Sequence, residues 1–176
     1  MENINTMKDA LTLLKTRRSI RKYKNKPVED EKIEKCLEAA RWAPSASNKQ
    51  PWEFLIVKDK KTREKIADIH PYARFTAESP VVFIPLTNPK IHEKYHISDT
   101  ALATLQYMIE AHSIGLGTCW AGVIDSSFEP QIKGILHVPE HLNILGLIAT
   151  GYPNEEPTKT RKELETLVHY EKYGKK

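Results

Sequence analysis

The stretch SDTALATLQYMIEAHSI, residues 98–114, carries the strongest helix signal in the chain and is central to the expected fold. Its apolar residues leave almost no polar face, so we expect a helix that lies in the centre of the molecule or in an interface. Ser98 is expected to cap this helix, and Asp99 falls in its first turn. The glycine-rich stretch Gly115-Leu116-Gly117 is expected to end it.

Shorter patterns flank this helix on both sides. Strands are expected at residues 52–57, 81–84, 118–121 and 142–149, and helices at residues 7–15, 29–42, 60–69, 128–136 and 162–168. Pro80 and Pro85 bound the second expected strand, and Pro44 follows the helix at residues 29–42. Strands and helices mix without strict alternation, so the sequence predicts an α+β fold. No repeat or composition break divides the chain, and we expect one domain over residues 1–176.

Composition excludes several classes of protein. Hydrophobic residues make up 40% of the 176 residues and charged residues 28%, which is typical of a soluble globular chain. The net charge of +4 comes without a basic run interleaved with aromatics, so no nucleic-acid partner is expected. Residues 1–6 hold no apolar signal segment, and the apolar runs at 81–86 and 144–149 are too short to span a bilayer. Cys36 and Cys119 lie far apart, which favours a reducing, cytoplasmic setting.

Two basic clusters and one polar loop are candidates for ligand binding. The clusters are RRSIR at residues 17–21 and KTR at residues 159–161, and guanidinium groups beside a hydroxyl suit a phosphate. The loop PSASNKQPW at residues 44–52 offers the amides of Asn48 and Gln50, which suit the edge of a heteroaromatic ring. The alternatives are a solvated basic face and an ordinary surface loop, because chain spacing alone does not prove that the clusters meet.

Two other motifs carry weaker signals. The run GLGTCWAG at residues 115–122 is not a dinucleotide fingerprint, because Trp120 stands where the third glycine belongs and the run follows a helix. The run HEKYH has the HExxH pattern of zinc proteases through His92, Glu93 and His96. A third zinc ligand is not obvious, and a zinc hydrolase is kept as an alternative.

The ordered set of motifs is more specific than any one of them. Its parts are RRSIRKY (17–23), AARWAPSASNKQPWEF (39–54), the helix and turn from 99 to 122, GYP (151–153) and KTR (159–161). Over nearly the whole chain this set resembles the nitroreductase family of FMN-dependent oxidoreductases. The resemblance implies an α+β fold with a central, mostly antiparallel sheet flanked by helices. It also implies an intertwined homodimer with FMN at the subunit interface and the helix at residues 98–114 in the dimer core.

The same resemblance assigns roles to individual residues. At the FMN phosphate it places Arg17, Ser19, Lys159 and Arg161, with Arg18 along the same cradle, and at the N1/O2 side of the ring it places Arg21. From the partner subunit, Pro44, Ser45 and Asn48 are expected to approach the ring, with Gln50 nearby. At the N5 edge of the ring it places the backbone of Trp120, Ala121 and Gly122. The implied reaction passes electrons from NAD(P)H through flavin N5 to a nitroaromatic, quinone or flavin acceptor by ping-pong turnover, without a catalytic side chain or a metal. The brief segment 69–97 implies a more exposed flavin and leaves open a non-catalytic FMN-binding or storage protein.

Overall fold

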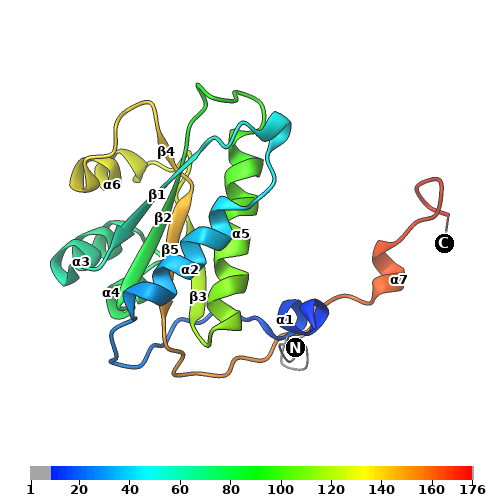
Figure 1. The fold of residues 1–176 in the computed structure, drawn as a ribbon, viewed down its shortest axis with the longest axis horizontal. Helices are drawn as coiled ribbons and strands as arrows, with labels where there is room; N and C mark the ends of the chain where they lie inside the picture. The colour runs from blue at the N-terminus through cyan, green and yellow to red at the C-terminus, as the bar shows by residue number, and fades with distance from the viewer. Residues whose placement is uncertain (1–8, 176) are drawn as a thin grey trace, which may run out of the picture.

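The computed structural model describes residues 9–175 and places helices on both faces of an antiparallel sheet (Figure 1). The strands in spatial order are β1 (Trp52–Val57), β2 (Val81–Thr87), β5 (Gly146–Gly151) and β3 (Gly117–Gly122), and β4 (Asn143–Ile144) also pairs with β2. Every strand pair is antiparallel. The predicted α+β class, with a mostly antiparallel sheet flanked by helices, is therefore confirmed.

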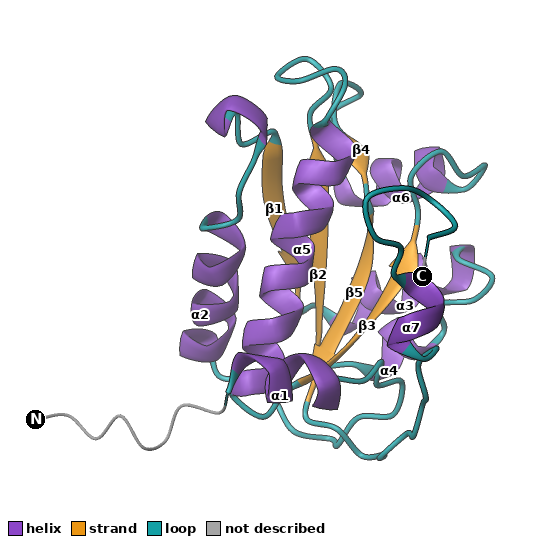
Figure 2. Ribbon diagram, turned by 90° about the vertical axis from the view of Figure 1, so that its right-hand side faces the viewer, coloured by secondary structure: helices purple, strands orange, loops and turns teal. Residues whose placement is uncertain are grey.

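The helices form two layers. One face of the sheet carries α2 (Asp30–Arg41) and α5 (His96–Ser113), and the other carries α3 (Lys60–Ile69), α4 (Phe75–Glu78) and α6 (Glu129–Leu136). Figure 2 shows α5 lying along the sheet, with α1 (Ala10–Thr16) across its C-terminal end. The single turn α7 (Leu164–Leu167) lies on a C-terminal arm that leaves the body of the protein (Figure 1).

Strand β2 shows why both faces need helices. All seven of its residues are buried, and alternate side chains point to opposite faces. Val81 and Phe83 join the core under α2 and α5, where the Phe83 ring stacks on Tyr107 with 4.1 Å between centroids. Val82 and Ile84 join the core under α3 and α6. A strand with two apolar faces is stable only when helices shield both of them from water.

The predicted end of this strand at Pro85 is wrong. Pro85 pairs with Phe54, and the strand runs on to Thr87. The Pro85 carbonyl accepts a hydrogen bond from the Leu145 amide at 2.9 Å, and Leu145 is the residue between β4 and β5. In an antiparallel sheet, the N–H and C=O groups of one residue point toward the same neighbouring strand. The missing N–H of Pro85 would therefore point toward Leu145, where the ladder is interrupted between β4 and β5, so the sheet tolerates a proline at this position. The break also divides the single strand predicted at residues 142–149.

The predicted cap of the central helix is also wrong. Helix α5 begins at His96, and Ser98 lies inside its first turn, where its hydroxyl donates to the Tyr95 carbonyl at 3.0 Å. The predicted glycine stop is confirmed, because Gly115 has a left-handed φ of 84° that ends the helix.

The remaining predicted elements differ from the structure by a few residues at most. The helix expected at 7–15 is observed as Ala10–Thr16, and residues 7 and 8 lie outside the described part. The helix expected at 162–168 is a single turn. Cys36 and Cys119 are both free and buried. Among residues 9–175, no helix is long and apolar enough to cross a membrane.

Candidate functional site

The first basic cluster is held between strand β3 and the segment that follows β5. The chain leaves α1 and runs beside the start of β3, where the Ile20 amide donates to the Thr118 carbonyl at 2.9 Å and Ser19 bridges Thr118. On the other side it pairs with the segment that follows β5, through a 2.9 Å bond from the Lys24 amide to the Tyr152 carbonyl. Backbone pairing therefore fixes the path of residues 17–24.

This path brings the two basic clusters together. A cavity of about 230 Å³ is lined by Arg17, Arg18, Ser19, Arg21, Pro157, Lys159 and Arg161. Six of these seven residues were predicted to contact FMN, and they come from segments that lie more than a hundred residues apart in the sequence. We call this cavity the cationic cradle.

The cradle concentrates positive charge. Partial burial, followed by the nearby Arg161 and Arg18 guanidiniums, lowers the pKa of Arg17. Within the described residues, none of the five cations of the cradle forms an ion pair with a carboxylate. Cations held together without carboxylate partners create a strong site for an anion, and guanidinium groups suit phosphate geometry.

Arg18 lines the cradle and also contacts the end of α1. Its Nη1 donates to the main-chain carbonyls of Lys15, at 2.6 Å, and of Arg17, at 2.8 Å. The guanidinium thus caps the end of α1, where helix carbonyls lack partners. Only the other edge of the group is left to face the cradle.

A second cavity adjoins the cradle at Arg21. This cavity of about 450 Å³ is lined by Arg21, His70, Tyr72, Phe75, Cys119, Trp120, Ala121, Gly122 and Phe128. It contains the predicted contacts Trp120, Ala121 and Gly122, and the Arg21 guanidinium lies 5.8 Å from the centre of the Phe75 ring. We call it the aromatic cavity. Burial raises the pKa of the Cys119 thiol, which keeps this thiol protonated and unreactive.

The predicted ring-binding loop lines neither the cradle nor the aromatic cavity of its own chain. The loop at residues 44–50 contacts the beginning of α5, because the Ala46 amide donates to the Asp99 carboxylate at 3.1 Å. Near the other end of α5, the Thr16 hydroxyl is 2.9 Å from His112 Nε2, just before the cradle. Asp99 and His112 are thirteen residues apart, about 20 Å along a helix axis. One chain therefore does not bring Asn48 to its own cradle.

The backbone of this loop is unusual. Ser47, Asn48 and Gln50 all have a left-handed φ, of 51°, 53° and 49°. Such conformations cost energy outside glycine and concentrate at ligand-binding sites. Asp99, only 5% exposed, anchors one end of the loop, and the Ser45 hydroxyl accepts from the Gln50 amide at 3.0 Å. Sequence reasoning placed Asp99 in the first turn of the helix and missed its role as an anchor.

Glu155 is a second residue that sequence reasoning missed. Its Oε1 accepts hydrogen bonds from the amides of Arg21, at 2.5 Å, and Lys22, at 3.1 Å. This carboxylate thereby joins the segment that carries Arg21 to the segment that leads to Arg161. No local pattern indicates this contact, because the partners are more than 130 residues apart.

His70 lines the aromatic cavity and forms a hydrogen bond with the backbone at the end of β3. Its Nδ1 accepts from the Tyr72 amide at 3.2 Å, which leaves Nε2 as the donor to the Gly122 carbonyl at 2.8 Å. Its ring also lies 4.6 Å from that of Phe128. The imidazole therefore fixes the end of β3, where the backbone was predicted to face flavin N5.

The HExxH motif does not have the geometry of a zinc site. His92 and Glu93 precede the helix, and His96 is its first residue, so the two histidines do not share a helix face. The buried His96 has Nδ1 3.0 Å from the Thr87 hydroxyl. Within residues 9–175, no group of three or more histidine, cysteine or acidic side chains is placed to hold a metal ion. The structure thus gives the zinc alternative no ligand set.

His96 makes the stability of the fold depend on pH. Burial lowers its pKa; His92 adds to this effect and Asp125 opposes it. The unfolded chain, with an ordinary pKa of about 6.5, then binds the proton more readily, so stability falls as the pH drops below this value. We expect a lower urea midpoint at pH 5.5 than at pH 7.5, and a smaller difference in His96→Gln. Equal pH dependence in both proteins would contradict this assignment.

The fold and the site together define an α+β protein in which a cationic cavity suited to phosphate lies beside an antiparallel sheet. A model of the nitroreductase family matches residues 14–71 and 70–152. A Methanothermobacter thermautotrophicus protein named NADH dehydrogenase/NAD(P)H nitroreductase is 35% identical, covering 94% of this chain and 88% of its own length. The chain belongs to the nitroreductase family, as the sequence motifs predicted.

Solved structures agree with this assignment. One from Parabacteroides distasonis, named NADH dehydrogenase/NAD(P)H nitroreductase, has a TM-score of 0.89 at 31% identity and covers 93% of this chain and 98% of its own. An FMN-dependent nitroreductase from Clostridium difficile has a TM-score of 0.87 at 29% identity, with 93% and 99% covered. The match over nearly the full length of each chain confirms the nitroreductase fold.

Proposed function

We propose that residues 1–176 form one cytoplasmic domain that works as an FMN-dependent NAD(P)H oxidoreductase, reducing a small organic acceptor by ping-pong turnover. The observation that carries this proposal is the convergence of the two basic clusters on one cradle, in a chain of the nitroreductase family. The name of the Clostridium difficile relative supports FMN as the cofactor, and the name of the Methanothermobacter relative supports NAD(P)H as the reductant.

The residues present fit this cofactor. Arg17, Ser19, Lys159 and Arg161 would hold its phosphate in the cradle, and Arg21, between the two cavities, would lie beside its ring. A cation there would stabilise negative charge on the reduced ring. When bound, FMN would supply the redox chemistry, accepting a hydride at N5 and passing the electrons on. The chain itself would bind, orient and shield the reactants.

The aromatic cavity supports a planar acceptor. Tyr72, Phe75 and Phe128 line it next to the backbone of Trp120 to Gly122. Aromatic walls favour flat, ring-bearing molecules through stacking and edge contacts. Nitroaromatics, quinones and flavins all have this shape. In ping-pong turnover, each of them would bind in the aromatic cavity after the oxidised nicotinamide has left it.

A homodimer would complete the site. The loop at residues 44–50 lies at the far end of α5 from the cradle of its own chain, so a second copy has to supply the loop. Exposed apolar side chains suit such an interface: Ile97, Leu102 and Leu105 on α5, Leu11 and Leu14 on α1, and Leu164, Leu167, Tyr170 and Tyr173 on the arm. Large apolar groups gathered on two helices and an arm are typical of protein interfaces.

Anaerobic reduction of the FMN-loaded protein tests the function. Stopped-flow mixing with NADH or NADPH should bleach the flavin absorption, and a later pulse of menadione, a quinone, should restore it without NAD(P)H present. Flavin that stays oxidised with both nucleotides would leave only the FMN-binding or storage role. A protein that retains no flavin after desalting would remove the cofactor proposal itself.

Coexpression of two defective variants tests the shared site. Arg161→Ala impairs the cradle, and Asn48→Asp impairs the loop while tolerating its left-handed φ. If each site combines the cradle of one chain with the loop of the other, random pairing gives one intact site in half of the dimers, so about a quarter of all sites recover. FMN-linked activity near the mean of the two single variants would instead place both elements in one chain.

A further inference from the structure

We propose that this protein has a second anion site, separate from the cradle, that binds a small diphosphate or polyphosphate anion. The site is a cleft of about 700 Å³ between the segment at residues 23–28, the start of α3, and the junction of α4 with β2. No residue that lines this cleft also lines the cationic cradle. We call it the α3 cleft.

The walls of the α3 cleft carry more positive than negative charge. The cations are Lys24, Lys26, Lys58, Lys60 and Arg63, and the carboxylates in the wall are Glu64 and Glu78. The cations come from two separate parts of the chain, and residues of both parts line the cleft. A concave surface lined mainly by one sign of charge focuses its potential on an ion of the opposite sign.

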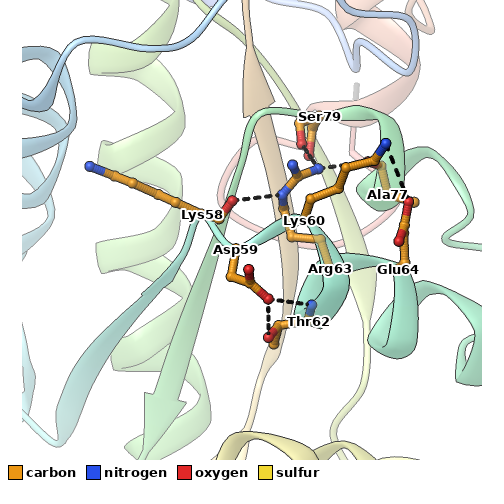
Figure 3. Close-up of polar contacts among 8 residues, drawn as sticks. All are labelled: Lys58, Asp59, Lys60, Thr62, Arg63, Glu64, Ala77 and Ser79. Atoms are coloured by element: carbon orange, nitrogen blue, oxygen red, sulfur yellow. Dashed lines mark hydrogen bonds and ion pairs between the residues drawn. The ribbon is translucent and has the colours of Figure 1, made fainter.

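Arg63 is the buried element of this site. Only 8% of the residue is exposed, and burial lowers the pKa of its guanidinium. Its Nη1 donates to the carbonyls of Ala77, at 2.6 Å, and of Ser79, and its Nε donates to the Lys58 carbonyl at 3.3 Å (Figure 3). Within the described residues no carboxylate lies at ion-pair distance from it, and the nearby carboxylates of Glu64 and Asp59 only partly offset the effect of burial on its pKa.

One edge of this guanidinium is not committed. The hydrogen bonds to carbonyls use Nε and Nη1, and Nη2 makes none to the described residues. The bonds to Ala77 and Ser79 explain why an arginine holds the end of α4. They do not explain why five cations outnumber two carboxylates in the wall of this cleft. An anion in the cleft would give Arg63 the ion pair that it lacks.

The two lysines beside Arg63 are held by exposed ion pairs. Figure 3 shows Lys58 extending to one side of Arg63 and Lys60 to the other. Lys58 pairs with Asp30, and Lys60 lies 3.7 Å from Glu64, with all four side chains well exposed. Exposed pairs of this kind contribute little to stability, so a multiply charged anion can compete for the ammonium groups. An anion with two or more phosphates reaches more of these cations than a single phosphate does.

Calorimetric titration with inorganic pyrophosphate tests this site. The protein is first saturated with FMN, so that the cradle is filled, and saturable binding of pyrophosphate is expected. Lys58→Gln/Lys60→Gln should raise the pyrophosphate Kd about tenfold or more, because two charged contacts are lost. The matched control is Lys61→Gln/Lys65→Gln, which removes the same charge from exposed positions of α3 that do not line the cleft.

Two outcomes would overturn the proposal. One is the absence of pyrophosphate binding at millimolar concentration, and the other is equal weakening in the two double variants, which would indicate diffuse surface charge. Because both double variants leave the cradle unchanged, their comparison reports on the α3 cleft whether or not FMN fills the cradle. Thermal unfolding of each variant checks that removing surface lysines leaves the fold intact.

Discussion

Arg161→Ala is expected to weaken FMN binding by about 1.5–3 kcal/mol, which corresponds to a Kd roughly 10 to 160 times higher. Arg161 lines the cradle and lies close enough to Arg17 to lower its pKa. A guanidinium in this position makes charged hydrogen bonds to phosphate that alanine cannot make. Fluorescence titration of FMN into the apoprotein measures the change directly.

Lys162→Ala is the matched control for this experiment. Lys162 is the next residue, is also exposed, and does not line the cradle. Its removal lowers the net charge by the same amount, so it reports the general electrostatic effect alone. Similar Kd values for wild type and Arg161→Ala, or equal losses in the two variants, would refute the assignment of Arg161 to the phosphate.

Glu155→Ala is expected to weaken FMN binding about tenfold, although a carboxylate next to a phosphate site should oppose binding. Its Oε1 is the acceptor for the amides of Arg21 and Lys22, and each hydrogen bond to a charged group is worth about 1.5–3 kcal/mol before solvent exposure reduces it. Without this acceptor, the segment that carries Arg21 loses its connection to the segment that leads to Arg161.

The variant Glu155→Gln distinguishes the hydrogen-bonding role of Glu155 from the effect of its negative charge on FMN binding. Glutamine keeps an oxygen acceptor for both amides and removes the negative charge, so FMN should bind as tightly as in wild type, or more tightly. If the carboxylate acted only by repelling phosphate, alanine and glutamine would both improve binding. Tighter FMN binding in Glu155→Ala would therefore contradict the positioning role.

Local sequence patterns were sufficient for much of the fold. The expected limits of β1 and α3 coincide with those observed, because a short apolar and aromatic run and a charged helical segment are both recognisable within a few residues of sequence. The true start of α5 was missed, since the chain enters this helix two residues before Ser98 without a side-chain cap. The path of β2 through Pro85 was missed because it depends on where β4 and β5 separate.

For the candidate site, too, some features could be predicted from the sequence and others only from the tertiary structure. The sequence by itself determined the residue types, namely two basic clusters, an amide-rich loop and a glycine-bounded strand, because their chemistry and order along the chain do not require coordinates. Only the tertiary structure decided that Arg17 and Arg161 share one cavity, and that the loop carrying Asn48 is anchored near the opposite end of α5 from the cradle of its own chain. It also decided that Glu155 and Asp99 hold these parts in place. Contacts between residues distant in sequence depend on how the sheet and helices pack, and no short stretch of sequence encodes that packing.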